Sequence, residues 1–247
     1  FYTMITGVLF WLFEDTNLVA RLLPVLAGSL MVFLPWLTGE WLSDRTKFFL
    51  SLGFAFDPAL MAASKTAGSY MIAVFALLLA VVLFLKKKPI GTGIALAIFL
   101  MSGASFLFGL IITALTLGWM LLRHDDEENI RAAIKDFPWK TFLITAGVTY
   151  LLVSSLFFLR PSGIGSSFQD IADAFSPQAR QTLPLGVLAL VVTIVLYETT
   201  AMLFGILGLV KNRTGLRLWM KFSFWASIFA FILLVLNPGR IALNLVW

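Results

Sequence analysis

The sequence predicts an all-α membrane protein: a polytopic transmembrane helix bundle of about eight membrane helices, including one short broken hairpin, plus an N-terminal interfacial helix. Two features of the 247-residue chain predict this class: 60% of its residues are hydrophobic and 13% are charged. Soluble domains average about 45–50% hydrophobic residues and about 25% charged residues. A third feature is that long apolar segments alternate with short charged turns. A soluble fold could not bury so much apolar surface, so we expect a multi-pass protein of the cell membrane.

The N-terminal segment, residues 1–13, is apolar but shorter than the roughly 20 residues that cross a bilayer. A polar turn follows, in which Thr16 or Asn17 is a suitable N-cap for the next helix. Two interpretations remain open, namely the end of a longer span or a helix that lies on the outer surface of the membrane. Because the chain begins at Phe1 without a methionine and stops inside an apolar stretch, we expect it to be part of a longer protein.

Six further segments have the hydropathy of a membrane helix: Leu18–Leu37, Phe48–Ala63, Ser69–Leu85, Thr141–Leu159, Leu183–Val210 and Leu218–Leu236. The segment 90–122 is different, because its 33 residues would form a helix of about 50 Å, longer than the roughly 30 Å hydrocarbon core. Small residues around Gly103 divide this segment. We therefore expect two short helices, Ile90–Met101 and Ala104–Leu122.

Lysine and arginine residues predict the orientation, since cytoplasmic loops collect them. If 90–122 is a hairpin, 13 of the 18 basic residues fall on one side and 5 on the other, whereas a single long helix divides them 8 against 10. The predicted cytoplasmic loops are 38–47, 86–89, 123–140 and 211–217. The predicted outer segments are 1–17, which forms a surface helix and turn outside the transmembrane domain 18–247, together with 64–68, 160–182 and 237–240.

Composition excludes several classes of function. With no cysteine and one histidine, the chain has no thiolate metal site, no metal site built from histidines and no Ser-His-Asp triad. The basic residues are dispersed between apolar segments, so the isoelectric point of 9.6 does not indicate a nucleic-acid partner. No glycine-rich phosphate loop occurs. The expected partners are membrane lipids and other membrane subunits.

Four ionisable residues are candidate site residues, because charged groups within a membrane are costly and often functional. Arg21, Asp57 and Lys65 are all expected near the outer surface. A cationic pocket closed by Asp57 would suit a lipid phosphate or pyrophosphate, and the alternative is a salt bridge between helices without a ligand. Glu198 is expected near mid-depth, either as a hydrogen-bond partner between helices or as a catalytic group.

Four segments of the chain share a family resemblance. Residues 20–28 read ARLLPVLAG, and residues 34–37 read LPWL. Residues 57–65, DPALMAASK, are similar to an "SP…YSR" segment, and residues 196–209 contain YE followed by GILGL, similar to a "YE…GL" helix. Together they resemble the GT-C superfamily of membrane glycosyltransferases, most closely the family-39 type, with protein O-mannosyltransferases and lipid A aminoarabinose transferases among its relatives.

The resemblance implies an enzyme that transfers a sugar from a polyprenyl-phosphate carrier to an acceptor on the outer face of the membrane. Arg21 and Lys65, which stands where the family has arginine, would contact the donor phosphate, and Asp57 would orient them. The acidic residue of the family's first outer loop would precede Phe1, so no catalytic residue is assigned.

The resemblance also allows a divalent metal, but the sequence offers no identifiable ligands for it, and no cofactor is expected in the chain itself. The alternative function is a non-catalytic membrane subunit that scaffolds a larger complex. A transporter fits less well, because such proteins usually carry several charges near the membrane midplane and Glu198 is the one expected there.

Overall fold

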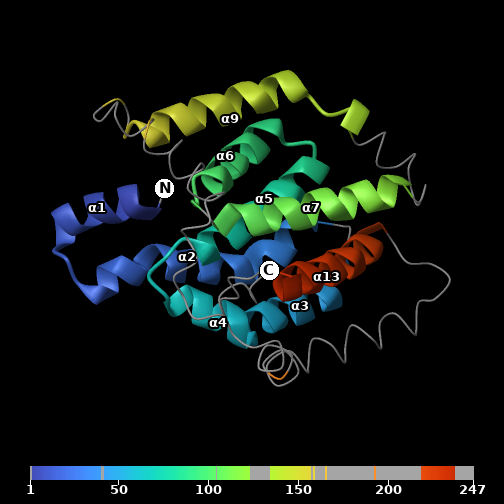
Figure 1. The fold of residues 1–247 in the computed structure, drawn as a ribbon, viewed down its shortest axis with the longest axis horizontal. Coiled ribbons are helices and arrows are strands. Elements are labelled where there is room, and N and C mark those ends of the chain that lie inside the picture. The colour runs from blue at the N-terminus through green and yellow to red at the C-terminus, as the bar shows by residue number, and fades with distance from the viewer. Residues whose placement is uncertain are drawn as a thin grey trace.

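The computed structural model of the chain describes residues 2–39, 42–103, 105–122, 134–156 and 218–236, together with the single positions 158, 165 and 192. The elements with defined bounds in this part of the chain are α-helices, and it contains no β-strand, which confirms the predicted all-α class. Figure 1 shows α1 projecting from one side of the molecule, while α9 lies along α6 on another.

The helices are α1 (Tyr2–Phe13), α2 (Asn17–Leu37), α3 (Asp44–Phe56), α4 (Pro58–Lys65), α5 (Tyr70–Leu85), α6 (Pro89–Leu100), α7 (Ser105–Leu122), α9 (Trp139–Ser154) and α13 (Leu218–Leu236). The bounds of α2, α5 and α13 agree closely with the predicted segments. Among the described helices, α2 is the one whose length and hydropathy together suffice to cross a membrane. The predicted helix 183–210 lies outside the described residues.

Helix α1 is joined to the start of α2 by a short polar turn. Thr16 is the N-cap of α2, because its Oγ1 accepts a hydrogen bond from the backbone N–H of Val19 at 3.3 Å. Glu14 precedes it in the left-handed region with a φ of 72°. The Tyr2 hydroxyl donates to the carbonyl oxygen of Ala20 at 2.9 Å. These contacts fold the N-terminal helix back onto the first turns of α2.

The predicted segment Phe48–Ala63 consists of two helices instead of one. Pro58 has no backbone N–H to donate within a helix, and Asp57 before it has the extended conformation, with φ −64° and ψ 119°. The Asp57 carboxylate then caps the new helix, since Oδ1 accepts from the backbone N–H of Leu60 at 2.8 Å. Helix α3 therefore ends at Phe56 and α4 begins at Pro58.

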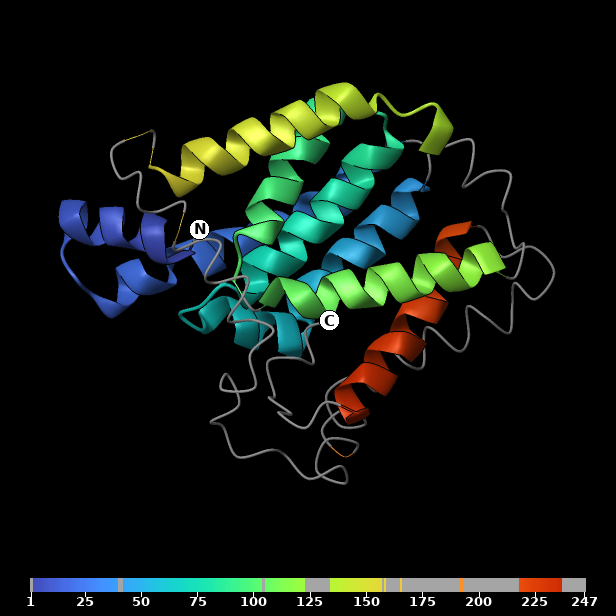
Figure 2. The same cartoon turned by 45° about the horizontal axis from the view of Figure 1, so that its top comes forward.

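The predicted division of 90–122 is present. Helix α6 ends at Leu100, and Gly103 in the turn has a φ of 66°, a conformation that glycine adopts without steric cost. The Phe99 and Phe106 rings, whose centroids are 5.9 Å apart, connect the ends of the two helices. Beyond this turn α7 packs against α13 and α5 instead of returning along α6, as Figures 1 and 2 show.

Helix α5 lies at the centre of the packing and contacts α2, α6 and α7. Small side chains permit this: Ala73, Ala76 and Ala80 are buried on α5, and Ala95 and Ala97 are buried on α6. Small residues allow two helix backbones to approach closely, which increases their van der Waals contact. The core is therefore built from close backbone approach and not only from bulky side chains.

Gly93 on α6 marks the closest approach to α9. A methyl group at this position would lie 2.9 Å from the backbone nitrogen of Ala146 and 2.9 Å from the carbonyl oxygen of Phe142. Both atoms belong to the helical backbone of α9 and cannot move as a side chain would. Glycine at this position is therefore required by packing and not by backbone conformation.

We predict that Gly93→Ala lowers the free energy of unfolding by about 1–3 kcal/mol, because the added methyl group overpacks the α6–α9 contact. Gly118→Ala on α7 is the matched control, since no atom of the described residues beyond its chain neighbours and its own helix backbone lies within 4 Å of its Cβ position. It should leave stability unchanged or raise it by up to about 1 kcal/mol, as alanine favours the helix. Unfolding in mixed micelles, followed by circular dichroism, measures both, and equal effects would contradict the packing argument.

Candidate functional site

The described helices extend between two ends that carry different side chains. We call the first the α1 end; it comprises α1 and the first turns of α2. We call the second the basic end; it comprises residues 38–47 except 40 and 41, residues 86–89 and residues 134–140. Lys86 joins the first two parts of the basic end, since its Nζ lies 3.4 Å from the Cβ position of Gly39. In Figure 2, α5 and α6 lie alongside each other between the two ends.

Arg21 and Lys65 lie on the neighbouring helices α2 and α4, at different levels along α2. Arg21 is exposed in the second turn of α2, and Lys65 is exposed as the last residue of α4. The two helices approach closely where the Cβ position of Gly28 lies 2.8 Å from Cβ of Ser64. Arg21 is therefore about 10 Å along α2 from the level of Ser64. Within the described part of the chain, neither cation has an acidic partner.

Asp57 is used differently from the orienting role that the resemblance implies. Its carboxylate caps α4 through the N–H of Leu60, and it forms no ion pair with Arg21 or Lys65, all three residues being described. Asp57 lies at the opposite end of the eight-residue helix α4 from Lys65. The structure therefore keeps the carboxylate apart from Lys65 along α4.

Asp57 instead borders a cavity of about 270 Å³ between six helices. Its other walls are mainly apolar and include Met31, Phe54, Leu60, Val74, Thr113 and Phe222. The Thr113 hydroxyl donates to the carbonyl oxygen of Gly109 within its own helix at 2.7 Å. Among the described residues that line this cavity, Asp57 is the charged one.

Two carboxylates at the α1 end were not singled out as site residues by sequence reasoning. Glu14 and Asp15 are both exposed in the turn between α1 and α2, close along the chain to Arg21. The signal that could have found them is their position directly before Thr16, in a turn that the sequence already assigned to the outer face. They supply acidic groups near the exposed cations.

The remaining predicted features fall outside the described residues or lack the groups they require. Glu198 lies outside the described residues, as do the predicted outer segment 237–240 and most of 160–182. In the described part of the chain, no group of three or more acidic or histidine side chains could hold a metal ion. These residues do not fit a divalent metal, and we derive no chemical step through one.

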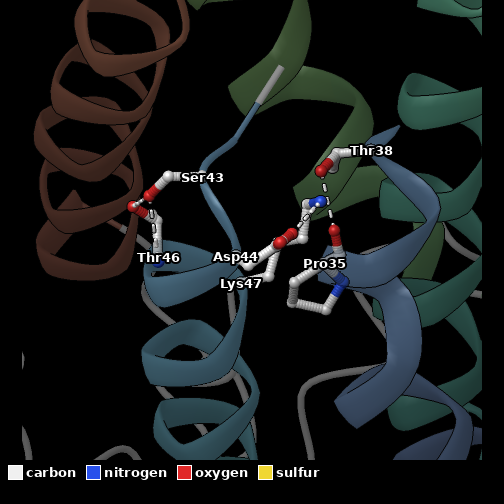
Figure 3. Close-up of polar contacts among 6 residues, drawn as sticks. All are labelled: Pro35, Thr38, Ser43, Asp44, Thr46 and Lys47. Carbon is white, nitrogen blue, oxygen red and sulfur yellow. Dashed lines mark hydrogen bonds and ion pairs between the residues drawn. The ribbon is translucent and has the colours of Figure 1, made fainter. Parts of the chain in front are cut away.

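The basic end is held together by a short set of polar contacts, which Figure 3 shows. Lys47 forms an ion pair with Asp44 at 2.8 Å, and its Nζ lies 5.9 Å from the ring centroid of Trp36. The Thr38 hydroxyl donates to the carbonyl oxygen of Pro35 at 2.6 Å, which caps the end of α2. Ser43 begins α3 by accepting a hydrogen bond from the Thr46 N–H.

Substitutions of Asp57 separate its capping role from a charge role. We predict that Asp57→Ala lowers the free energy of unfolding by about 1 kcal/mol, because the Leu60 N–H loses its acceptor. Asp57→Asn should remain within a few tenths of a kcal/mol of the wild type, since its side-chain oxygen still accepts this hydrogen bond. Thermal unfolding measures both variants. If Asn is as destabilising as Ala, the negative charge and not the cap is what matters.

Comparison with known proteins identifies no relative of this chain. No protein-family model matches the chain, and neither the curated proteins nor the solved structures contain a match. The features of this chain that bear on its function are therefore the two charged ends and the apolar surface between them.

Proposed function

We propose that the chain is the multi-pass membrane part of a glycosyltransferase that binds a polyprenyl-phosphate-linked sugar at its α1 end. The first support is the surface between the two ends. Large apolar side chains point outward on several helices, among them Phe33 (64% exposed), Phe49 (69%), Phe56 (74%) and Leu143 (61%). A soluble monomer rarely exposes contiguous apolar surface on this scale, whereas a bilayer covers it.

Helix α3 and helix α4 together support a membrane location, although neither is long enough to cross alone. They extend from Asp44 to Lys65 with the one break at Asp57, a length of about 33 Å if the two follow one axis. Charged residues are confined to the two termini and the break. The cap at Asp57 satisfies the first donors of α4 internally, as a bilayer requires.

The observation that carries the proposed ligand is the presence of Arg21 and Lys65 on the neighbouring helices α2 and α4, both exposed and without an acidic partner among the described residues. An exposed guanidinium and an exposed ammonium group at the boundary of an apolar surface suit a phosphate attached to an apolar chain. The phosphate would lie at the charged end, and the polyprenyl chain would extend along the apolar helices. Glu14 and Asp15 are the acidic groups closest along the chain to Arg21, and we propose them as contacts for the sugar hydroxyls.

The cysteine-free sequence permits a direct test of the membrane topology. Single cysteines at Glu14 and Thr66 should react with a membrane-impermeant maleimide in intact cells, because both positions belong to the predicted outer face. Single cysteines at Thr46 and Lys87 should react only after permeabilisation. All four residues are exposed in the structure, so accessibility reports the side of the membrane. Labelling of all four in intact cells would contradict the proposed orientation.

For ligand binding, we predict that Arg21→Ala and Lys65→Ala each weaken binding of a polyprenyl phosphate about ten-fold, a loss of about 1.4 kcal/mol. This is the low end for a charged hydrogen bond, because both side chains are exposed. Arg21→Lys should retain most of the affinity. Arg45→Ala, which removes an exposed charge at the other end, should leave it unchanged. Titration of the purified chain in nanodiscs of neutral lipid measures the dissociation constants.

The alternative function, a non-catalytic scaffold subunit, predicts a different result for the same titration. A scaffold would bind the polyprenyl phosphate no better than the neutral host lipid, and Arg21→Ala would have no effect. Equal affinities of the wild type and this variant would therefore remove the donor-binding assignment and favour the scaffold.

A further inference from the structure

Basic side chains outnumber acidic ones at the basic end. Within residues 42–103 and 134–156, the acidic residues of this end are Asp44 and Asp136, and the basic residues are Arg45, Lys47, Lys86, Lys87, Lys88, Lys135 and Lys140. Both carboxylates are already engaged, Asp44 with Lys47 at 2.8 Å and Asp136 with Lys87 at 3.3 Å. Lys86 and Lys88 therefore have no acidic partner among the described residues.

Helix ends account for only part of this arrangement. The last turns of α2 and α5 both lie at the basic end, and the C-terminus of a helix carries partial negative charge that attracts lysine. Lys86, beside Gly39 at the end of α2, is explained in this way. Lys88 lies between two helix ends, because its N–H donates to the carbonyl oxygen of Leu83 in the last turn of α5 at 3.0 Å and it directly precedes α6, whose N-terminus carries partial positive charge. The α5 terminus therefore neutralises Lys88 less than it does Lys86.

Aromatic rings form a layer directly below the lysines. Phe84, Phe137, Trp139 and Phe142 are in mutual ring contact, with centroids of Phe84 and Phe137 4.5 Å apart. Trp139 is 42% exposed, and its Nε1–H donates to the carbonyl oxygen of Ile134 at 2.7 Å. Tryptophan with one polar contact and an exposed apolar face is typical of the headgroup depth of a bilayer.

The order of these layers identifies the partner. Along α5 and the turn after it, an apolar helix is followed by the aromatic layer and then by Lys86, Lys87 and Lys88. This is the order that a protein meets on passing from hydrocarbon through the interface to anionic headgroups. Phe137 and Phe142 are buried by helix packing, so Trp139, the exposed ring of the layer, is the one that favours a bilayer interface over a protein partner or a soluble anion.

We propose that the basic end is a binding surface for anionic phospholipid headgroups, with Lys86 and Lys88 as its principal phosphate contacts. This surface is separate from the α1 end and faces the opposite leaflet. The Lys87–Asp136 pair joins two segments of this surface, the Lys47–Asp44 pair is local to α3, and the two lysines without an acidic partner among the described residues carry the excess charge.

The test uses a local reporter, since the chain has no native cysteine. Ile90, which is 58% exposed in the first turn of α6, is replaced by cysteine and labelled with bimane. Quenching by doxyl-labelled phosphatidylglycerol relative to doxyl-labelled phosphatidylcholine then gives the lipid preference at this end. We expect a preference for phosphatidylglycerol that falls about five-fold in Lys86→Gln and again in Lys88→Gln, equivalent to about 1 kcal/mol for each charge.

Three controls make the result decisive. Lys86→Arg with Lys88→Arg should retain the preference, because the charges remain. Arg21→Gln with Lys65→Gln should leave the Ile90 reporter unchanged, so the present proposal and the donor-binding proposal fail independently. Unchanged circular dichroism and thermal unfolding exclude misfolding of the glutamine variants.

Two outcomes would overturn the proposal. One is the absence of any preference for phosphatidylglycerol in the wild type, which would mean that acidic residues balance these lysines, or its full retention in the double glutamine variant, which would mean that other residues carry the preference. The other is loss of the lipid preference on adding millimolar inorganic phosphate at constant ionic strength, which would assign the lysines to a soluble anion instead.

Discussion

The close approach of α5 to its neighbours is the constraint on which the rest of the structure depends. Ala73 and Ala76 are fully or almost fully buried on this helix, so α2 and α6 pack near its backbone. A larger side chain at either position would force the neighbouring helices apart. Because α5 extends from the α1 end to the basic end, its position also determines that the turn after Lys65 and the turn at Lys86 lie at opposite ends.

Much of the helical layout could be predicted from the sequence, for identifiable reasons. The limits of α2 and α5 follow from charged or polar turns at their ends, and the break near Gly103 follows from the excessive length of 90–122. Hydropathy could not show that Asp57 ends one helix and caps the next, because the residues on both sides are apolar. Nor could it show that α7 turns away from α6, since that depends on packing with α13, which is distant in sequence.

The candidate site could be predicted only in part. Arg21 and Lys65 are conspicuous as rare charges beside apolar segments, and the structure shows them on the neighbouring helices α2 and α4. Their relation to Asp57 could not be derived, because a carboxylate followed by proline can either pair with a cation or cap a helix. The local hydrogen bond from the Leu60 N–H decides this, at 2.8 Å. Glu14 becomes a candidate site residue only when the structure shows it exposed in the turn between α1 and α2.

The interruption at Asp57–Pro58 also has a mechanical consequence. A proline cannot continue the hydrogen-bond ladder of the helix before it, and the aspartate cap gives α4 a separate beginning. Tilting α4 therefore requires rotation about a few backbone bonds and breaks no helical turn. The eight-residue helix is about 12 Å long. Ser64, close to its end, contacts Gly28 of α2. Lys65, the last residue of α4, is the residue of this helix farthest from the break.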